Sequence, residues 1–297
     1  MSEQFPEFVC PYARRLAARS RPFALQAYDS TRKPSSGEAV DRGFSTDPFG
    51  ELSSAAKCRG IRQRFPDRVL VMTSNRCFMN CRHCTRRGIL SHSEVVESEE
   101  DLRRAVDYVK ARPRVRDVLL SGGDILTLSD DQVMRFVDAF AALGQIDIVR
   151  VCTRAPCVNP PRITPALAQA LGRSKKVWVN TQFNCVDEVT DEAKRAAALL
   201  VEAGVPVSCQ TVLLKGVNDS AAAMLRLFRA LSAARIRPYY VFMCDPVAGI
   251  DHFRVSLAKA RAIEEKCARS IGGLSLPRFV CDLPGAKRKL PLSEVEP

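Results

Sequence analysis

The sequence predicts an α/β protein whose core is a parallel β-sheet. Seven short apolar segments rich in β-branched residues recur from Arg68 onward, and helical patterns lie between most of them. Parallel neighbours need a crossover connection, so strands that alternate with helices predict a parallel sheet. The segments are apolar almost throughout, which predicts cover on both faces. An open doubly wound sheet and a full or partial β/α barrel both fit this pattern.

The first part of the chain differs from the rest. Residues 1–62 predict helical segments joined by a polar loop, and we expect an appendage that packs on a core of residues 63–297. In the core, Ser129 precedes an acidic first turn and Gly204 ends a helical pattern, as helix caps do. Strands are predicted at residues 68–73, 117–122, 146–153, 176–182, 206–214, 238–244 and 278–283. Helices are predicted at residues 97–113, 129–144, 164–174, 190–204, 219–235 and 256–273.

Polar residues stand at the ends of the predicted strands. A buried core needs none of them, whereas the carboxyl ends of parallel strands build the active site in both architectures. We therefore expect the site to include Asp124, Arg154, Asn180, Gln210, Asp245 and Asp282.

The composition is that of an ordinary globular enzyme. The net charge is +12, but the basic residues are spread along the chain and aromatic residues make up only 7%, so nucleic-acid binding is not predicted. No apolar run reaches the roughly 18 residues of a membrane span, and the N-terminus lacks a secretory signal. Twelve cysteines lie in scattered, mostly apolar contexts. They indicate reduced thiols, and we expect a cytoplasmic protein that does not bind membranes.

The segment RCFMNCRHCTRR, residues 76–87, carries three cysteines directly after the first predicted core strand. Cys77, Cys81 and Cys84 have the spacing C-x3-C-x2-C. A structural zinc site needs a fourth ligand, usually from a second pair, and the remaining cysteines are isolated. Three buried thiols without a metal fit poorly in a loop rich in Arg and Asn. The pattern therefore favours an iron–sulfur cluster in which three thiolates leave one iron open.

These motifs occur in a recognisable order. The cysteine spacing after a strand resembles the radical S-adenosylmethionine superfamily, which implies a partial (β/α)6-type TIM barrel. The segments RFPDRVLVMTSNRCFMNCRHCTRR, SGGD, CTRAP, NTQFN, GVPVSCQTVLLKGVND, RPYYVFMCD and FVCDLPG resemble the lysine 2,3-aminomutase family over about residues 60–292. The resemblance implies a [4Fe–4S] cluster, S-adenosylmethionine and pyridoxal 5′-phosphate as cofactors. It also implies an isomerase that moves the α-amino group of a basic L-amino acid, above all L-lysine to β-lysine, by a 5′-deoxyadenosyl radical.

The resemblance assigns one set of residues to S-adenosylmethionine. In SGGD, adjacent glycines let the backbone approach a ligand, and the aspartate can accept a hydrogen bond from an ammonium group. One departure is visible, because Gln182 stands where the family usually has histidine. The expected contacts of this cofactor are His83, Ser121, Gly122, Gly123, Asp124, Arg154, Asn180 and Gln182.

Three residues are expected to bind the substrate. Arg86 follows the third cysteine by two residues, and by resemblance its guanidinium holds the substrate carboxylate. Asp245 and Asp282 each end an apolar strand, and two buried carboxylates together suggest a bound cation. By resemblance they receive the distal amino group of lysine, although salt bridges with arginines of the chain fit them too.

Pyridoxal phosphate needs a lysine for its Schiff base and cations for its phosphate. The family's lysine follows the second aspartate by seven residues, which here gives Lys289 in DLPGAKRKLPL. The run GAKR replaces the family's glycine-rich loop, which makes Lys287 a rival and a basic tail an alternative. By resemblance, Arg64 and Arg68 contact the phosphate and Gln210 faces the ring of this cofactor.

Other expectations concern partners and alternatives. The best-known lysine members carry a C-terminal zinc site, whereas this chain stops at Pro297 and has Ser220 in place of a cysteine. We expect no zinc, a different or smaller homo-oligomer, and an electron donor of the flavodoxin or ferredoxin type. One alternative is a relative that acts on another amino acid or a secondary-metabolite precursor, or that performs radical chemistry without pyridoxal phosphate. Another is a basic iron–sulfur or zinc protein that binds nucleic acid.

Overall fold

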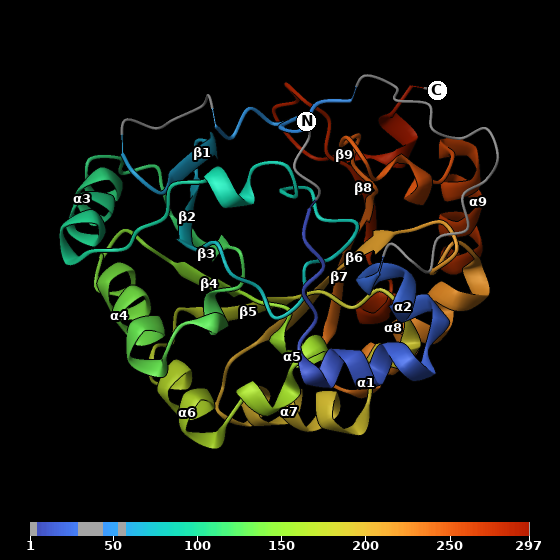
Figure 1. Ribbon diagram of the computed structural model, residues 1–297, viewed down its shortest axis with the longest axis horizontal. Coiled ribbons are helices and arrows are strands. Elements are labelled where there is room, and N and C mark those ends of the chain that lie inside the picture. Colours follow the sequence, from blue (N-terminus) through green and yellow to red (C-terminus); the bar gives the residue numbers. More distant parts are fainter. Residues whose placement is uncertain (1–4, 29–43, 53–57, 297) are drawn as a thin grey trace.

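The strands of the protein follow one another around a partial barrel (Figure 1). The computed structural model describes residues 5–28, 44–52 and 58–296, which contain one nine-stranded open sheet in the order β1 to β9. Strands β2 to β8 pair in parallel, and β1 and β9 pair antiparallel at the two edges. A doubly wound sheet reverses its strand order at a switch point. An order that follows the chain throughout therefore confirms the partial barrel.

All the strands predicted from the sequence are present, and two short edge strands add to them. The edge strand β1 is polar, with the sequence IRQRF, and it spans the expected boundary at residue 62. The strands are β1 (Ile61–Phe65), β2 (Arg68–Ser74), β3 (Asp117–Gly122), β4 (Ile148–Cys152), β5 (Val177–Thr181), β6 (Val207–Leu213), β7 (Arg237–Met243), β8 (Arg278–Cys281) and β9 (Leu290–Pro291).

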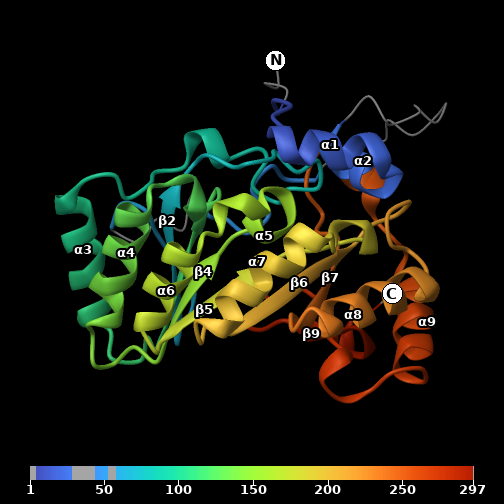
Figure 2. The same ribbon diagram turned by 90° about the horizontal axis from the view of Figure 1, so that it is seen from below.

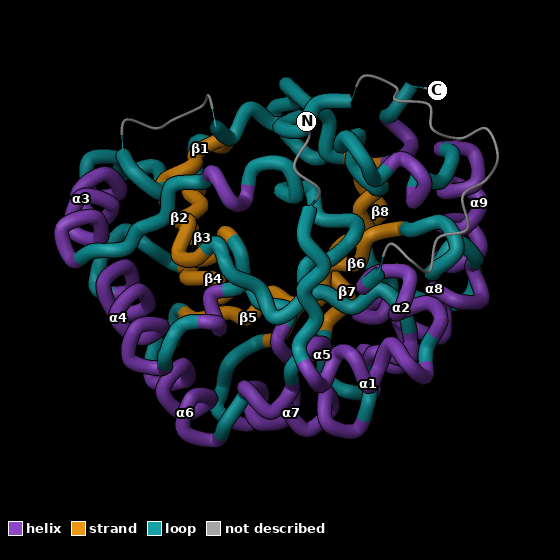
Figure 3. The backbone as a smooth tube through the Cα atoms, in the orientation of Figure 1, coloured by secondary structure: helices purple, strands orange, loops and turns teal. Residues whose placement is uncertain are grey.

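Helices form the outer ring around the strands, as Figure 3 shows. Ser98 with Asp101 and Ser129 with Gln132 form capping boxes, which satisfy backbone N–H groups at the start of two of these helices. The helices of the core are α3 (Glu99–Lys110), α4 (Asp130–Ala141), α5 (Ala155–Val158), α6 (Pro165–Arg173), α7 (Asp191–Glu202), α8 (Ala221–Ala233) and α9 (Leu257–Ala268).

The two faces of the sheet differ in polarity. Along β4, Val149 and Val151 are fully buried in the hydrophobic core, whereas Arg150 and Cys152 line a cavity inside the barrel. Side chains alternate between the two faces of a strand, so the outer face packs on the helices and the inner face is left for ligands.

The N-terminal helices α1 (Pro11–Arg19) and α2 (Arg21–Ala27) lie over one end of the barrel (Figure 2). Residues leading into α1 pair with the cysteine loop, because Val9 forms an antiparallel bridge with Met79 and the Cys10 N–H donates to the Phe78 carbonyl at 2.9 Å. The appendage is thus joined to the loop that carries the candidate metal ligands. No helix in the described ranges is long and apolar enough to cross a membrane.

Candidate active site

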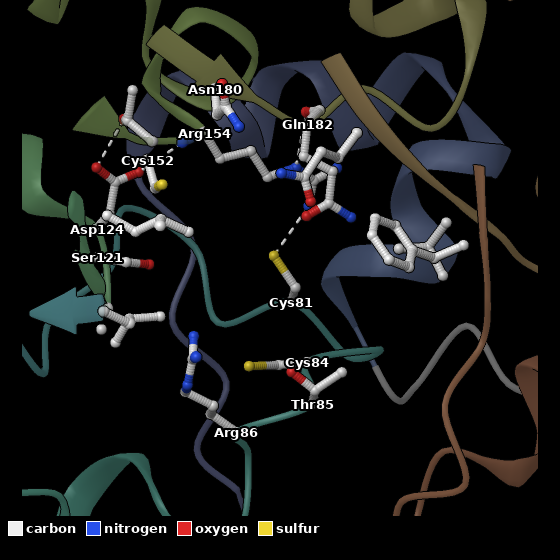
Figure 4. Close-up of a pocket in the computed structure, with 18 of the residues that line it drawn as sticks. Cys81, Cys84, Thr85, Arg86, Ser121, Asp124, Cys152, Arg154, Asn180 and Gln182 are labelled. Carbon is white, nitrogen blue, oxygen red and sulfur yellow. Dashed lines mark hydrogen bonds between the residues drawn. The ribbon is translucent and has the colours of Figure 1, made fainter. Parts of the chain in front are cut away.

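One cavity of about 430 Å³ occupies the inside of the barrel, and Figure 4 shows part of its wall. Strand ends and the cysteine loop supply most of its lining, as expected for the carboxyl ends of parallel strands. Lys287 is exposed and is not part of the lining. The lining includes every other candidate residue named from the sequence: Arg64, Arg68, Cys77, Cys81, His83, Cys84, Arg86, Ser121, Gly122, Gly123, Asp124, Arg154, Asn180, Gln182, Gln210, Asp245, Asp282 and Lys289.

The three cysteines of the loop after β2 all face this cavity. Burial first, and then the neighbouring Cys81, raises the pKa of the Cys84 thiol to about 11. Without a cation nearby, thiolates close together at this buried wall would repel one another and raise the free energy of the folded protein. Coordination to iron offsets this repulsion, because metals bind the thiolate form. Three soft donors on one wall therefore fit an iron–sulfur cluster.

The SGGD segment, which begins within the end of β3, holds the cysteine loop in place. The Gly123 N–H donates to the Ser74 carbonyl at 2.6 Å, and the Asp124 N–H donates to the Arg76 carbonyl at 2.7 Å. A Cβ atom at Gly123 would lie 2.2 Å from the Arg76 carbonyl oxygen, and Gly122 has a φ of 111°. The glycines are thus required for contact between two backbone segments, and these two N–H groups do not face a ligand.

The Asp124 side chain joins the end of β3 to the segment after β4. Its Oδ1 accepts hydrogen bonds from Thr153 Oγ1 at 2.7 Å and from the Leu126 N–H at 3.0 Å. Its Oδ2 accepts one from the Arg154 N–H at 2.8 Å. Burial raises the pKa of this carboxyl, while the bonds from Thr153 and Arg154 oppose the rise. The carboxylate therefore fixes the geometry of two neighbouring strand ends.

Arg154 connects the cysteine loop to a buried carboxylate. Its Nη1 donates to Cys81 Sγ at 2.9 Å, and its Nη2 donates to Gln26 Oε1 at 2.7 Å and to Glu188 Oε1 at 3.1 Å. Glu188 has no exposed surface. A donor on a ligand sulfur is one of the features that set the reduction potential of an iron–sulfur cluster. Sequence reasoning missed Gln26 and Glu188, because neither ends a strand.

His83 and Gln182 lie against each other on the same wall. Gln182 Nε2 is 2.9 Å from His83 Nε2, and Asn184 Nδ2 is 3.3 Å from the same nitrogen. Burial, and then Arg154, lowers the pKa of His83 well below its usual range. The imidazole is therefore neutral, and Nε2 accepts from the amide of Gln182. The glutamine that departs from the family pattern is thus bonded to a residue of the cysteine loop.

Arg86 forms a two-pronged ion pair that the sequence does not indicate. Its Nε donates to Glu51 Oε2 at 2.6 Å and its Nη2 donates to Glu51 Oε1 at 2.8 Å. Burial opposes ionisation of Glu51, but Arg86 outweighs it and holds the pKa of this carboxyl below its usual range. Glu51 lies in the segment DPFGEL, which has neither a strand nor a helix pattern.

The two candidate aspartates differ in their partners. Arg64 donates to both carboxylate oxygens of Asp282, at 3.0 and 3.3 Å, and Lys289 Nζ lies 3.7 Å from Asp282 Oδ2. Among the described residues, the buried Oδ1 of Asp245 has no hydrogen-bond partner. Burial first, and then the charge of Asp282, raises the pKa of Asp245 to about 7. Asp282 therefore forms salt bridges within the chain, as one of the two expectations for the aspartates stated. Oδ1 of Asp245 has no comparable partner.

Lys289 lies inside the cavity and has the surroundings of a reactive amine. Its Nζ is 5.2 Å from the ring centroid of Phe65 and 5.5 Å from that of Phe242. Burial lowers its pKa, although Asp282 opposes the shift. A lysine must be neutral to act as a nucleophile, so this environment fits a lysine that binds pyridoxal phosphate. Arg68 and Gln210 line the same cavity.

Comparisons with known proteins show the family to which the chain belongs. Residues 71–228 match the Radical SAM superfamily. A putative L-lysine 2,3-aminomutase from Aquifex aeolicus is 35% identical over 286 residues, which cover 91% of this chain and 77% of that protein. The chain belongs to the lysine 2,3-aminomutase family of radical SAM proteins. A glutamate 2,3-aminomutase from Clostridioides difficile is 35% identical over 260 residues, or 87% of this chain and 61% of that protein.

The family relatives are longer than this chain. An L-lysine 2,3-aminomutase from Fusobacterium nucleatum is 42% identical over 233 residues, or 78% of this chain and 55% of that protein. Across the first four such relatives, the match spans 55% to 60% of their length. Membership implies a [4Fe–4S] cluster and S-adenosylmethionine, and the aminomutase relatives imply pyridoxal phosphate.

Solved structures share the fold. SuiB from Streptococcus suis, bound to S-adenosylmethionine, superposes with a TM-score of 0.54 at 17% identity, covering 74% of this chain and 48% of that one. A radical SAM methyltransferase from Sphaerobacter thermophilus superposes with a TM-score of 0.52 at 18% identity, covering 74% of this chain and 68% of that one. At these low sequence identities, the superpositions show a shared fold, which is the partial barrel.

Proposed function

We propose that this protein is a radical SAM 2,3-aminomutase that moves the α-amino group of a basic L-amino acid, foremost L-lysine, to the β-carbon. The observation that carries the proposal is the aspartate pair, because Oδ1 of Asp245 is buried without a hydrogen-bond partner in the described residues and Asp245 lies beside Asp282. A ligand cation would supply the missing partner. The same cavity also contains three thiols, an arginine and a lysine suited to the family's cofactors.

The proposed roles follow from the positions in the cavity. Cys77, Cys81 and Cys84 would bind the cluster, and Lys289 would bind pyridoxal phosphate. When bound, the cluster with S-adenosylmethionine supplies hydrogen abstraction, and pyridoxal phosphate supplies the carbon that holds the migrating nitrogen. The remaining roles are S-adenosylmethionine contacts from His83, Ser121, Gly122, Gly123, Asp124, Arg154, Asn180 and Gln182; pyridoxal phosphate contacts from Arg64, Arg68 and Gln210; and substrate contacts from Arg86, Asp245 and Asp282.

The aspartate pair also bears on the choice of amino acid. An acidic side chain would add a third negative charge beside Asp245 and Asp282, whereas an ammonium group would offset the two already present. Sites built to pair a charged group reject ligands without it by roughly 10⁴-fold. Lysine is therefore favoured over glutamate as the substrate.

The test is product analysis with anaerobically reconstituted protein. Iron, sulfide, S-adenosylmethionine, pyridoxal phosphate and reductant are supplied together with lysine, arginine, ornithine or glutamate. We expect β-lysine from lysine, identified by mass spectrometry against a standard. Conversion of glutamate alone would reject the basic substrate, and no turnover of any of the four would reject the aminomutase proposal.

A second candidate is a family relative that works on another precursor without pyridoxal phosphate, and the run GAKR at residues 285–288 motivates it. Failure of the protein to acquire the visible absorbance of bound pyridoxal phosphate would favour this candidate. We further propose that the protein works in the cytoplasm, receives electrons from a partner protein of the flavodoxin or ferredoxin type and forms a homo-oligomer. The supporting observation for a reducing compartment is that all twelve cysteines are free thiols.

A further inference from the structure

The ion pair between Arg86 and Glu51 uses only one edge of the guanidinium. Nε and Nη2 bond to the two oxygens of Glu51 at 2.6 and 2.8 Å. A guanidinium carries five N–H groups in a planar fork. The end-on edge, made of Nη1 and the second N–H of Nη2, lies outside this pair. Figure 4 shows the guanidinium pointing into the cavity on the side of Cys84.

Glu51 is held in place by the turn that carries it. Asp47 Oδ1 accepts from the Glu51 N–H and Asp47 Oδ2 accepts from the Leu52 N–H, both at 2.8 Å. The same segment lies against the cysteine loop, because a Cβ atom at Gly88 would be 2.7 Å from the Thr46 Cβ. The carboxylate is thus presented by a fixed backbone and not by a flexible surface chain.

The segment is also anchored on the opposite side of the cavity. The Ala248 N–H donates to the Ser45 carbonyl at 3.1 Å, and the Arg64 guanidinium lies 4.5 Å from the Phe49 ring centroid. Residues 44–52 therefore connect the cysteine loop, β1 and the segment after β7. A contact held from three directions can fix the orientation of a long side chain.

Charge at this wall remains favourable for an incoming carboxylate. After burial and Arg86, the groups that act on the pKa of Glu51 are Arg62 and Arg64, and both lower it. Arg62 is buried and lines the cavity. Arg64 is paired with Asp282, so Arg86 and Arg62 together face the single carboxylate of Glu51. The two guanidinium groups and the one carboxylate leave a net positive charge at this wall.

We propose that Glu51 is a positioning residue for Arg86: it occupies the side-on edge of the guanidinium so that the end-on edge receives the substrate carboxylate. The inference rests on the proposed function, in which Arg86 binds that carboxylate. Arginine has several rotatable bonds, and orienting its fork in advance reduces the entropy lost when a ligand binds. A competing geometry has the substrate carboxylate displace Glu51 from Arg86.

The two geometries predict opposite effects of Glu51→Gln. If Glu51 positions Arg86, the substitution should raise both the Kd and the KM for lysine by roughly tenfold with kcat changed by less than about threefold, because only ground-state and transition-state binding of the carboxylate are lost. If the substrate displaces Glu51, removing the competing charge should lower both constants. Kd is measured by calorimetry without reductant, so that it does not depend on turnover.

Lysinamide provides the readout that a general structural defect would not change. It lacks the carboxylate, so its weaker binding should be nearly the same for wild type and Glu51→Gln, and the preference for lysine over lysinamide should fall by roughly tenfold. Glu97→Gln is the matched control, because Glu97 forms an exposed ion pair with Arg59 at 3.2 Å. It should leave all these constants unchanged.

Each outcome decides between the possibilities. A Kd for lysine that is unchanged or lower in Glu51→Gln, with active wild type, overturns the inference and leaves the proposed function intact. A wild type that neither binds nor converts any amino acid rejects the proposed function and this inference with it. If Glu51→Gln loses its iron or does not fold, the same measurements are made on Asp47→Ala. This variant keeps the charge of Glu51 but removes the hydrogen bonds that hold its turn. The same rise in Kd is then expected, and no rise overturns the inference.

Discussion

Replacing Asp245 with asparagine should stabilise the ligand-free protein at alkaline pH and weaken its binding of a basic amino acid. Asp245 Oδ1 is buried without a partner in the described residues. Burial and the nearby Asp282 raise its pKa to about 7. A carboxyl whose pKa is raised by folding binds its proton more tightly in the folded state. Its contribution to stability is therefore present at low pH and is lost as the pH rises from about 4 to about 7.

The size of this effect follows from the shift. The pKa moves from 3.8 to about 7, and each unit corresponds to about 1.36 kcal/mol. Ionised Asp245 thus costs at most about 4 kcal/mol above pH 7, with Arg64 and Lys289 already acting in the opposite direction. Asparagine keeps the shape and does not ionise. The variant should gain about 2 to 4 kcal/mol over wild type at pH 8, and the gain should vanish near pH 4.

Urea unfolding at pH 4 and pH 8, followed by circular dichroism, measures this difference. Asp147→Asn is the control, because Asp147 forms an exposed ion pair with Arg116 and its loss should cost less than about 1 kcal/mol at either pH. The Kd for lysine should rise at least about 30-fold in Asp245→Asn, as expected when one partner of a buried charge pair is removed. Equal stabilities of Asp245→Asn and wild type at pH 8 would refute the burial argument.

Three further substitutions test other parts of the site. Glu188→Gln leaves the buried Arg154 without its counter-ion and should lower the free energy of unfolding by about 3 to 5 kcal/mol; a loss below 1 kcal/mol would contradict the burial of this pair. Lys289→Ala should abolish the visible absorbance of bound pyridoxal phosphate, whereas Lys287→Ala should retain it, and the reverse result would reassign the lysine. Gly123→Ala places a Cβ 2.2 Å from a backbone oxygen of the cysteine loop, so iron content after reconstitution should fall well below that of wild type.

The sheet and the strand-end residues could be predicted because both depend on local patterns. Apolar segments that alternate with helices specify parallel strands, and parallel strands bring their carboxyl ends together. Asp124, Asn180 and Asp245 therefore gather in one cavity although they are far apart in the sequence. The edge strand β1 escaped prediction because IRQRF is polar, which is typical of an edge and not of a buried strand.

The residues that support the site could not be predicted in the same way. Gln26 lies 128 residues from Arg154, and Glu51 lies 35 residues from Arg86. Neither follows an apolar strand, and their partners are set by how the N-terminal segments pack on the cysteine loop. Such contacts depend on tertiary packing and leave no periodic signal in the sequence. A polar residue within the apolar helix segment PFALQA was the only local hint of Gln26.

Under the proposed function, the charges in the cavity set the orientation in which an amino acid binds. Arg86 lies at the wall that carries Cys84, whereas Asp245 and Asp282 follow β7 and β8. Under the proposed function, a lysine bound in reverse would place its carboxylate against two carboxylates and its ammonium against Arg86. Only one orientation pairs both ends. It brings the carboxylate, and with it the α- and β-carbons, toward the cysteine wall, and it keeps the distal carbons away. Hydrogen abstraction near the cysteines would therefore act at the carboxylate end of the substrate, on the α- or β-carbon and not on the distal carbons, because the anchors at the two ends set which carbons lie within reach.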